Sequence, residues 1–161
     1  SRGGVMGRLD GQVAIVTGGG SGIGRETATM LAAEGAHVVV AGRRTQPLDT
    51  LVAEIGKAGG KATARQADVA KHAEAVGLAR FAVETLGRVD VLVNNAGHSS
   101  KARSIRWVGK DEWDSVLDVN LNGVYALTQA VLPSMLERGG GTIVTVSSVA
   151  AFRPGLIGGA P

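Results

Sequence analysis

The chain has 161 residues, which is long enough for one domain with an apolar core of its own. Hydrophobic residues make up 44% and charged residues 19%, and the net charge of +3 is scattered along the chain. The composition is therefore that of a globular protein without a nucleic-acid-binding stripe. The absence of cysteine excludes disulfides and thiolate metal sites and fits a reducing, cytoplasmic location. No apolar run is long enough to cross a bilayer, which argues against a membrane partner.

Strand-like and helix-like segments alternate along the chain. Residues 1–8 are expected to form a disordered or vector-derived lead, with Met6 as a natural start, and residues 9–161 a single domain. The expected strands cover residues 13–16, 37–41, 61–67, 89–93 and 142–146, and the expected helices cover residues 23–34, 46–58, 71–86 and 111–137. Strands that alternate with helices form right-handed βαβ crossovers, so the sequence predicts the α/β class with a doubly wound parallel sheet.

The apolar spacing also predicts which surfaces are buried. In the helices 23–34 and 71–86 the expected inward residues are Ile23, Thr27, Met30, Leu31, Val76, Ala79, Val83 and Leu86. The fifth strand is expected to leave an apolar edge that contains Ile143, Val144 and Val146.

A glycine-rich turn joins the first strand to the first helix, with the sequence Thr-Gly-Gly-Gly-Ser-Gly-Ile-Gly at residues 17–24. Backbone N–H groups of such a turn, and of the helix N-terminus behind it, converge on one point and favour an anion there. Glycine leaves room for a pyrophosphate to approach the backbone. The predicted contacts are Gly18, Ser21, Gly22, Ile23 and Gly24, and the alternative is a turn with a purely structural role.

Two arginines, Arg43 and Arg44, stand at the end of the second strand, where nicotinamide-binding folds meet the adenosine ribose. An acid at this place would bind the ribose hydroxyls and repel a 2′-phosphate, but the first acid to follow is Asp49. Guanidinium groups bind phosphate in bidentate geometry, so the sequence predicts NADP in preference to NAD. A solvated arginine pair on a surface loop is the alternative.

The third and fourth strands also end in residues suited to a cofactor. Asp68 could accept a hydrogen bond from an adenine amino group while Val69 packs on the ring, although Asp68 could equally be the N-cap of the next helix. The fourth strand ends in Asn94-Asn95-Ala96-Gly97, whose amides can tie adjacent strand ends together. The predicted cofactor contacts here are Asn95, Ala96 and Gly97, and a simple turn is the alternative.

Further polar residues are candidates for chemistry. Asn120 is a poor helix former inside the helix 111–137, which predicts a kink or a functional polar group. Ser147 and Ser148 follow the fifth strand, where a serine is either catalytic or a strand cap. The histidines His37, His72 and His98 form no metal-ligand pattern, so no metal site is predicted, and His98 is interpreted as a loop residue near the cleft.

In their order and intervals these motifs closely resemble those of the short-chain dehydrogenases/reductases, over about residues 9–161. The resemblance implies a Rossmann-like dinucleotide-binding domain with strand order 3-2-1-4-5. It implies two catalytic residues: Ser148, which would hydrogen-bond the substrate oxygen, and Asn120, which would support a water in a proton relay. Ser148 is preferred to Ser147 because Val149-Ala150-Ala151 follows it, as in the family pattern.

The family pattern continues with Tyr-x-x-x-Lys shortly after the serine, and this sequence ends at Pro161, about where the tyrosine is due. Tyr125 has no lysine at the required spacing. We expect the sequence to be the recorded part of a longer protein rather than a genuine truncation, with the C-terminal strands missing from it and Gly155–Pro161 a disordered active-site segment. Residues 1–161 alone are then expected to be inactive.

The implied function is transfer of a hydride between NADP(H), or NAD(H), and a small-molecule carbonyl or secondary alcohol. A homodimer or homotetramer formed through the helix 111–137 is also implied, with no nucleic-acid or membrane partner. One alternative is a noncatalytic dinucleotide-binding sensor or scaffold. Another is a nucleic-acid binder, which only the basic isoelectric point suggests.

Overall fold

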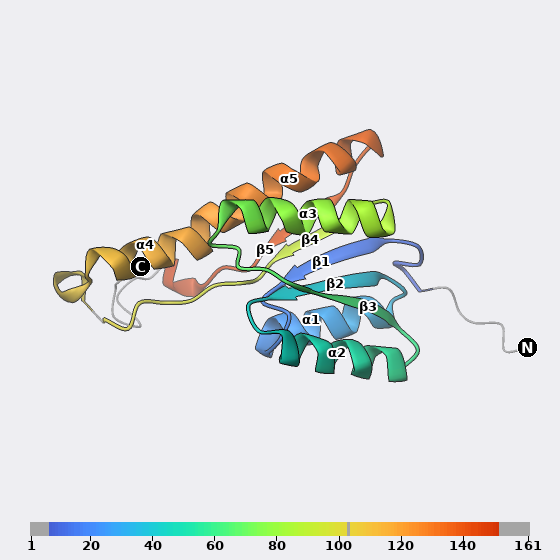
Figure 1. Ribbon diagram of the computed structural model, residues 1–161, viewed down its shortest axis with the longest axis horizontal. Coiled ribbons are helices and arrows are strands. Elements are labelled where there is room, and N and C mark those ends of the chain that lie inside the picture. Colours follow the sequence, from blue (N-terminus) through green and yellow to red (C-terminus); the bar gives the residue numbers. More distant parts are fainter. Residues whose placement is uncertain (1–6, 103, 152–161) are drawn as a thin grey trace, which may run out of the picture.

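The computed structural model describes residues 7–102 and 104–151, which form three layers with a sheet in the middle (Figure 1). The strands are β1 (Val13–Thr17), β2 (His37–Gly42), β3 (Lys61–Gln66), β4 (Val91–Asn94) and β5 (Thr142–Thr145). The helices are α1 (Gly22–Ala33), α2 (Thr45–Lys57), α3 (His72–Leu86), α4 (Lys110–Leu117) and α5 (Gly123–Glu137), and the short helical segments are η1 (Ile105–Trp107), η2 (Asp118–Asn122) and η3 (Val149–Ala151). Residues 1–6 of the expected lead and the segment Gly155–Pro161 lie outside the described residues. Arg8, in the rest of that lead, pairs with Glu34.

The sheet is parallel and has the order β3-β2-β1-β4-β5, which confirms the predicted order 3-2-1-4-5. The chain runs outward from β1 to β3 and then continues on the other side of β1 with β4. The strand order therefore reverses between β1 and β4, and open α/β sheets bind their ligands at such a reversal, outside the carboxyl ends of the strands.

The central strands are apolar on both faces because each face is covered by helices (Figure 1). Ile15 of β1 points into the core formed with α3 and α5. Its neighbours Ala14 and Val16 point into the second core, formed with α1 and α2. Figure 1 shows α1 and α2 on one side of the sheet and α3 and α5 on the other.

The predicted buried face of α1 is wrong in part. Ile23 and Met30 are 66% and 68% exposed, whereas the buried residues are Gly24, Ala28 and Ala32. Small residues face the sheet because α1 packs closely against it, so side-chain size decides the face here rather than hydrophobicity. The prediction for α3 holds for Ala79, which is buried, and for Val83 and Leu86, which pack partly buried against the core, while Val76 is 38% exposed.

The single helix predicted for residues 111–137 is interrupted by a π-helical turn, η2. The backbone N–H of Gly123 donates to the carbonyl of Asp118, five residues earlier. The side-chain amide of Asn122 donates to Asp118 Oδ1 at 2.8 Å. The expected kink near Asn120 is thus a wide turn, and turns of this kind are frequently found at functional sites.

The fifth strand pairs with β4 and exposes its apolar side chains. Ile143, Val144 and Val146 are 37%, 46% and 38% exposed, as the expected apolar edge requires. Among the described residues, none of the helices combines the length and the apolarity needed to span a membrane.

Candidate cofactor site

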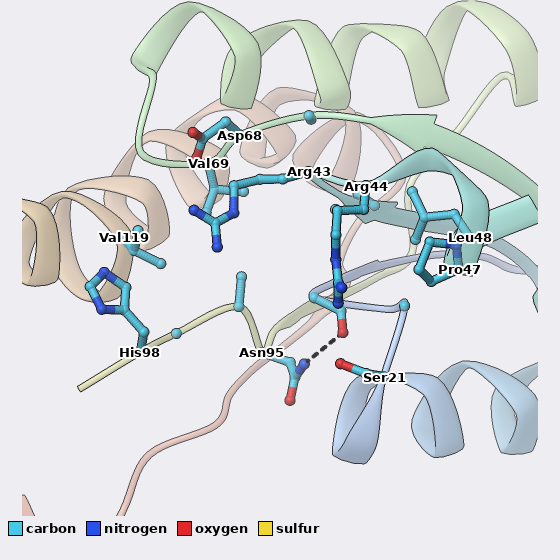
Figure 2. A pocket seen from close by; sticks show the side chains of 17 residues that line it. Ser21, Arg43, Arg44, Pro47, Leu48, Asp68, Val69, Asn95, His98 and Val119 are labelled. Carbon is cyan, nitrogen blue, oxygen red and sulfur yellow. Dashed lines mark hydrogen bonds between the residues drawn. The ribbon is translucent and has the colours of Figure 1, made fainter. Parts of the chain in front are cut away.

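A cavity of about 270 Å³ opens at the carboxyl ends of β1, β2 and β4, next to the reversal of strand order. Its lining comes from five separate parts of the chain, and Figure 2 labels residues from each of them. It is lined by Gly18, Gly20, Ser21, Ala41, Gly42, Arg43, Arg44, Pro47, Leu48, Ala67, Asp68, Val69, Asn95, Ala96, Gly97, His98 and Val119. Most of the predicted cofactor residues therefore lie around one space, although the sequence separates them by up to about eighty positions.

The glycine turn forms the floor of the cavity through Gly18, Gly20 and Ser21. Gly18 has a φ of +64°, and a Cβ there would lie 2.9 Å from Asn95 Nδ2. A Cβ at Gly24 would lie 2.4 Å from both Asn95 Nδ2 and the Gly18 carbonyl, so no side chain fits at either glycine. Gly22, Ile23 and Gly24 do not line the cavity themselves; Gly22 and Gly24 shape the turn, and the Ile23 side chain is exposed.

The N-terminus of α1 is suited to an anion. Within the described residues, the Ser21 side chain makes no capping hydrogen bond to the first turn, and that turn contains no acidic residue. The first backbone N–H groups of a helix need partners, and the helix dipole favours a negative charge at this end. A phosphate group placed beside Ser21 would supply acceptors for these N–H groups and a negative charge for the helix dipole.

Thr17 and Asn95 lock the end of β1 to the end of β4. The Thr17 hydroxyl accepts hydrogen bonds from the backbone N–H groups of Asn95 and Ala96, each at 3.0 Å, and donates to the Val93 carbonyl at 3.4 Å. The Asn95 amide donates to the Thr17 carbonyl at 2.9 Å. It also approaches the Gly18 carbonyl at 3.5 Å, the contact that is dashed in Figure 2. This is the tie between adjacent strand ends that the sequence predicts. Asn94 instead donates to Thr128 of α5.

Both arginines extend from the end of β2 along the cavity (Figure 2). They are exposed, and the Arg43 carbonyl accepts a hydrogen bond from Gln66 at 2.9 Å, which fixes the backbone from which they start. Two guanidinium groups beside an uncapped helix N-terminus make this side of the cavity strongly attractive to phosphate.

Asp68 and Val69 line the cavity from the loop that follows β3. The N-cap alternative for Asp68 is wrong, because α3 begins at His72 after the N-cap residue Lys71. Asp68 Oδ1 instead accepts the Ala70 N–H at 3.1 Å, and the Asp68 N–H donates to Glu74 at 2.7 Å. Hydrogen bonds from the Lys71 side chain and the Asp68 N–H hold the pKa of Glu74 below its usual range. The Glu74 carboxylate that accepts the Asp68 N–H therefore stays charged at neutral pH.

Asn120 lies beside the cavity and is not among its lining residues in the described part of the chain, and both ends of its amide bond to the His98 backbone. Its Oδ1 accepts the His98 N–H at 3.1 Å, and its Nδ2 donates to the His98 carbonyl at 2.8 Å. The His98 ring, which lines the cavity, reaches the Ser115 carbonyl at 3.1 Å. Glu112 accepts a hydrogen bond from Ser100 at 2.8 Å. The loop after β4 is therefore held against α4 and η2 along its length.

Ser148 is exposed, and in the described part of the chain it is not among the residues that line the cavity. Its hydroxyl accepts the Ala150 N–H at 3.2 Å, and it follows β5 at the same edge of the sheet as the cavity. Gly20, Pro47, Leu48 and Val119 also line the cavity and were not predicted as cofactor contacts. Pro47 and Leu48 lie in the first turn of α2, and the proximity of that helix start to the glycine turn is the signal that could have found them.

A doubly wound domain with a glycine turn at the reversal of its strand order belongs to the class of nucleotide-binding α/β proteins. A sequence profile of the short chain dehydrogenases matches residues 12–160. The chain therefore belongs to the short-chain dehydrogenase family.

Relatives of known name agree with this assignment. Dehydrogenase/reductase SDR family member 4 of Bos taurus is 43% identical over 91% of this chain and 52% of its own length. The 3-oxoacyl-(acyl-carrier-protein) reductase FabG of Thermotoga maritima is 40% identical over 88% of this chain and 57% of its own. The chain thus spans a little over half the length of these curated relatives.

Solved structures share the fold. A metagenomic short-chain oxidoreductase in complex with NADP superposes with a TM-score of 0.85 at 37% identity, over 88% of this chain and 64% of that one. A 7α-hydroxysteroid dehydrogenase complexed with NADH and 7-oxo glycochenodeoxycholic acid superposes with a TM-score of 0.84 at 39% identity, over 90% of this chain and 56% of that one.

Proposed function

We propose that the protein transfers a hydride between NADP(H) and a small-molecule carbonyl or secondary alcohol. The observation that carries the proposal is the single cavity in which the glycine turn, the arginine pair and the end of β4 meet. The cavity fits a dinucleotide because glycines stand where a Cβ would collide and because the helix N-terminus beside it lacks a side-chain cap within the described residues. Family membership and relatives complexed with NADP or NADH support the same conclusion.

The residues of the cavity divide the work of binding. The turn around Gly18 and Ser21 would hold the pyrophosphate, and Arg43 and Arg44 would hold the 2′-phosphate of the adenosine ribose. Asp68 and Val69 would meet the adenine. The bound nicotinamide would supply the hydride, while the protein supplies position and proton transfer.

The catalytic roles of Ser148 and Asn120 are part of this proposal. Ser148 would donate a hydrogen bond to the substrate oxygen and polarise it. Because the Asn120 amide is committed to the His98 backbone, we infer that Asn120 acts by fixing the loop and the π-turn rather than by moving its side chain.

We propose further that two copies pair through the outer face of η2 and α5. Leu121, Tyr125, Leu132 and Leu136 are 59%, 59%, 39% and 73% exposed and recur at intervals that place them on one side of the helix. Such a stripe is typical of an interface rather than of a solvated helix face.

Cofactor titration tests the function. NADPH should bind about 10- to 100-fold more tightly than NADH, because the 2′-phosphate gains charge-assisted hydrogen bonds to Arg43 and Arg44. Arg43→Ala and Arg44→Ala should reduce this preference, whereas Arg80→Ala, on an exposed ion pair of α3, should leave it unchanged. Equal affinity for the two cofactors, unaltered in Arg43→Ala, would contradict the assignment of NADP.

One observation favours a second candidate, a noncatalytic dinucleotide binder: Ser148 stands outside the described lining of the cavity. A full-length protein that binds NADPH but reduces no carbonyl in a broad panel of aldehydes and ketones would support the second candidate over the first.

A further inference from the structure

Gly123 is the point at which α5 rests on the loop that carries Asp68 and Val69. A Cβ at position 123 would lie 2.6 Å from the Val69 carbonyl oxygen and 3.1 Å from its carbon. Real Cβ atoms essentially never approach another atom to within 3.0 Å, and the obstacle here is backbone, which cannot rotate away as a side-chain tip could. Only glycine permits the observed contact.

The same residue closes the π-turn. The Gly123 N–H donates to the Asp118 carbonyl, and a Cβ at position 123 would lie 3.2 Å from that oxygen. Gly123 is buried and is therefore held from two sides: by the wide turn that precedes α5 and by the loop after β3. A side chain at this position would have to displace one of them.

The two segments that meet at Gly123 carry adjacent walls of the cavity. Val69 lines it from the loop after β3, and Val119 lines it from the π-turn (Figure 2). The distance between these walls depends on how closely the turn and the loop approach one another, and that approach is limited at Gly123.

We propose that Gly123 is a positioning residue that sets the spacing of Val69 and Val119 at the apolar end of the cavity, so that a flat aromatic base can contact both side chains. This inference rests on the proposed function, in which Asp68 and Val69 meet the adenine of the cofactor. The proposal concerns the distance between two segments. An ordinary van der Waals contact begins at 3.4 Å, whereas a Cβ at position 123 would lie 2.6 Å from the Val69 carbonyl oxygen. An added methyl group would therefore push the segments apart by about 0.8 Å. A gap of this size forfeits a quarter to a half of the dispersion attraction at the wall that moves.

The test compares the two ends of the cofactor. In the full-length protein carrying Gly123→Ala, the Kd for adenosine 2′,5′-bisphosphate measured by calorimetry should rise about tenfold, because the ring loses close contact with one of the two valines. The Kd for reduced nicotinamide mononucleotide should change less than about twofold, because that half lies away from the displaced wall. Gly77→Ala in α3 is the matched control, since an added Cβ there would meet no described atom within 4 Å. It should change neither Kd.

A merely structural role for Gly123 predicts a different pattern. The proposal is overturned if folded Gly123→Ala binds the adenosine ligand with an unchanged Kd. It is also overturned if the two halves of the cofactor lose the same amount of affinity. Should Gly123→Ala fail to fold, Val119→Ala widens the same end of the cavity without touching the helix contact. Val119→Ala should selectively weaken binding of the adenosine ligand. An unchanged Kd of this variant for that ligand would equally contradict the proposal. If the wild-type protein does not bind adenosine 2′,5′-bisphosphate at all, the proposed function itself has failed.

Discussion

At the scale of single residues, Thr17 illustrates how a buried hydroxyl can organise a site. It is 2% exposed, and its oxygen accepts two N–H groups from the loop after β4 while it donates to Val93. A buried polar group is costly unless its hydrogen-bonding capacity is used, so the lock forms only in one arrangement of the two strand ends. That arrangement places Gly18 against Asn95 and fixes the floor of the cavity.

Ser148 provides a prediction at the same scale. In the full-length protein, Ser148→Ala should lower kcat by on the order of 100-fold, because a hydrogen-bond donor to the developing charge on the substrate oxygen is lost. The Kd for NADPH, measured by fluorescence titration, should stay within about twofold, because Ser148 lies outside the described lining of the cavity. Ser147→Ala is the neighbouring control and should keep the wild-type rate. If Ser148→Ala leaves kcat unaffected, Ser148 has no catalytic role and only caps the strand.

Many residues of the site could be predicted from the sequence, because the residue types of a motif and their spacing indicate what the motif can bind. The glycine turn, Arg43 and Arg44, and Asn95 to Gly97 all follow directly on strands. They line the cavity, apart from Gly19, Gly22, Ile23 and Gly24 of the turn. Val119 could not be predicted in this way. A valine inside a helix has no distinguishing local pattern, and only the packing of the π-turn against the loop after β3 brings it to the site.

At the scale of elements, Asp90 joins three strands at their amino ends. Its carboxylate accepts the Val13 N–H at 2.8 Å and two hydrogen bonds from Arg88, at 2.6 and 2.7 Å. Its backbone bonds to Val13 of β1 and to Thr142 of β5. Burial by itself would raise the pKa of Asp90, but the hydrogen bonds from Arg88 and from Val13 outweigh it and hold the pKa below its usual range.

This lowered pKa predicts how stability depends on pH. A carboxyl group with a depressed folded-state pKa stabilises the protein above its unfolded-state pKa, and this contribution is lost as the pH falls through the folded-state value. Asp90→Asn should therefore lower the free energy of unfolding by about 1–3 kcal/mol at pH 7. The difference from wild type should shrink below about pH 4.

Urea unfolding at pH 7, 5 and 3.5 measures the effect. Glu84→Gln, in an exposed ion pair on α3, is the control and should cost less than about 0.5 kcal/mol throughout. A difference between Asp90→Asn and wild type that is the same at all three pH values would show that the charge of Asp90 contributes nothing to strand pairing.

Element boundaries and types were predictable to different degrees. The alternation of strands and helices follows from the spacing of apolar residues, which is visible within each short segment of the sequence. The π-turn was predictable only as a kink near Asn120, because its width is set by the hydrogen bond between Gly123 and Asp118 and by contact with Val69. The buried face of α1 was misjudged because closeness to the sheet selects Ala28 and Ala32 over larger side chains.

At the scale of the whole molecule, the apolar stripe on η2 and α5 predicts self-association. Sedimentation velocity at micromolar concentration should find the full-length protein as a dimer or tetramer. Leu136→Glu should shift it toward monomer, because it would bury an unpaired charge in the interface. Met30→Glu, at an equally exposed apolar residue of α1, should leave the assembly intact. A monomeric wild-type protein, or an unchanged assembly in Leu136→Glu, would contradict the prediction.

The sequence by itself determined the α/β class, because strand-like and helix-like segments alternate along the chain. The order of its motifs determined the resemblance to a family, and that resemblance implied the strand order. Only the tertiary structure decided which motif residues meet. It brought Val119, Pro47 and Leu48 to the cavity, committed the Asn120 amide to the His98 backbone, and left Ser148 outside the described lining. The physical reason is that recognition depends on distances between backbones, such as the approach of Val69 to Gly123, and these distances are fixed by packing between segments far apart in the chain.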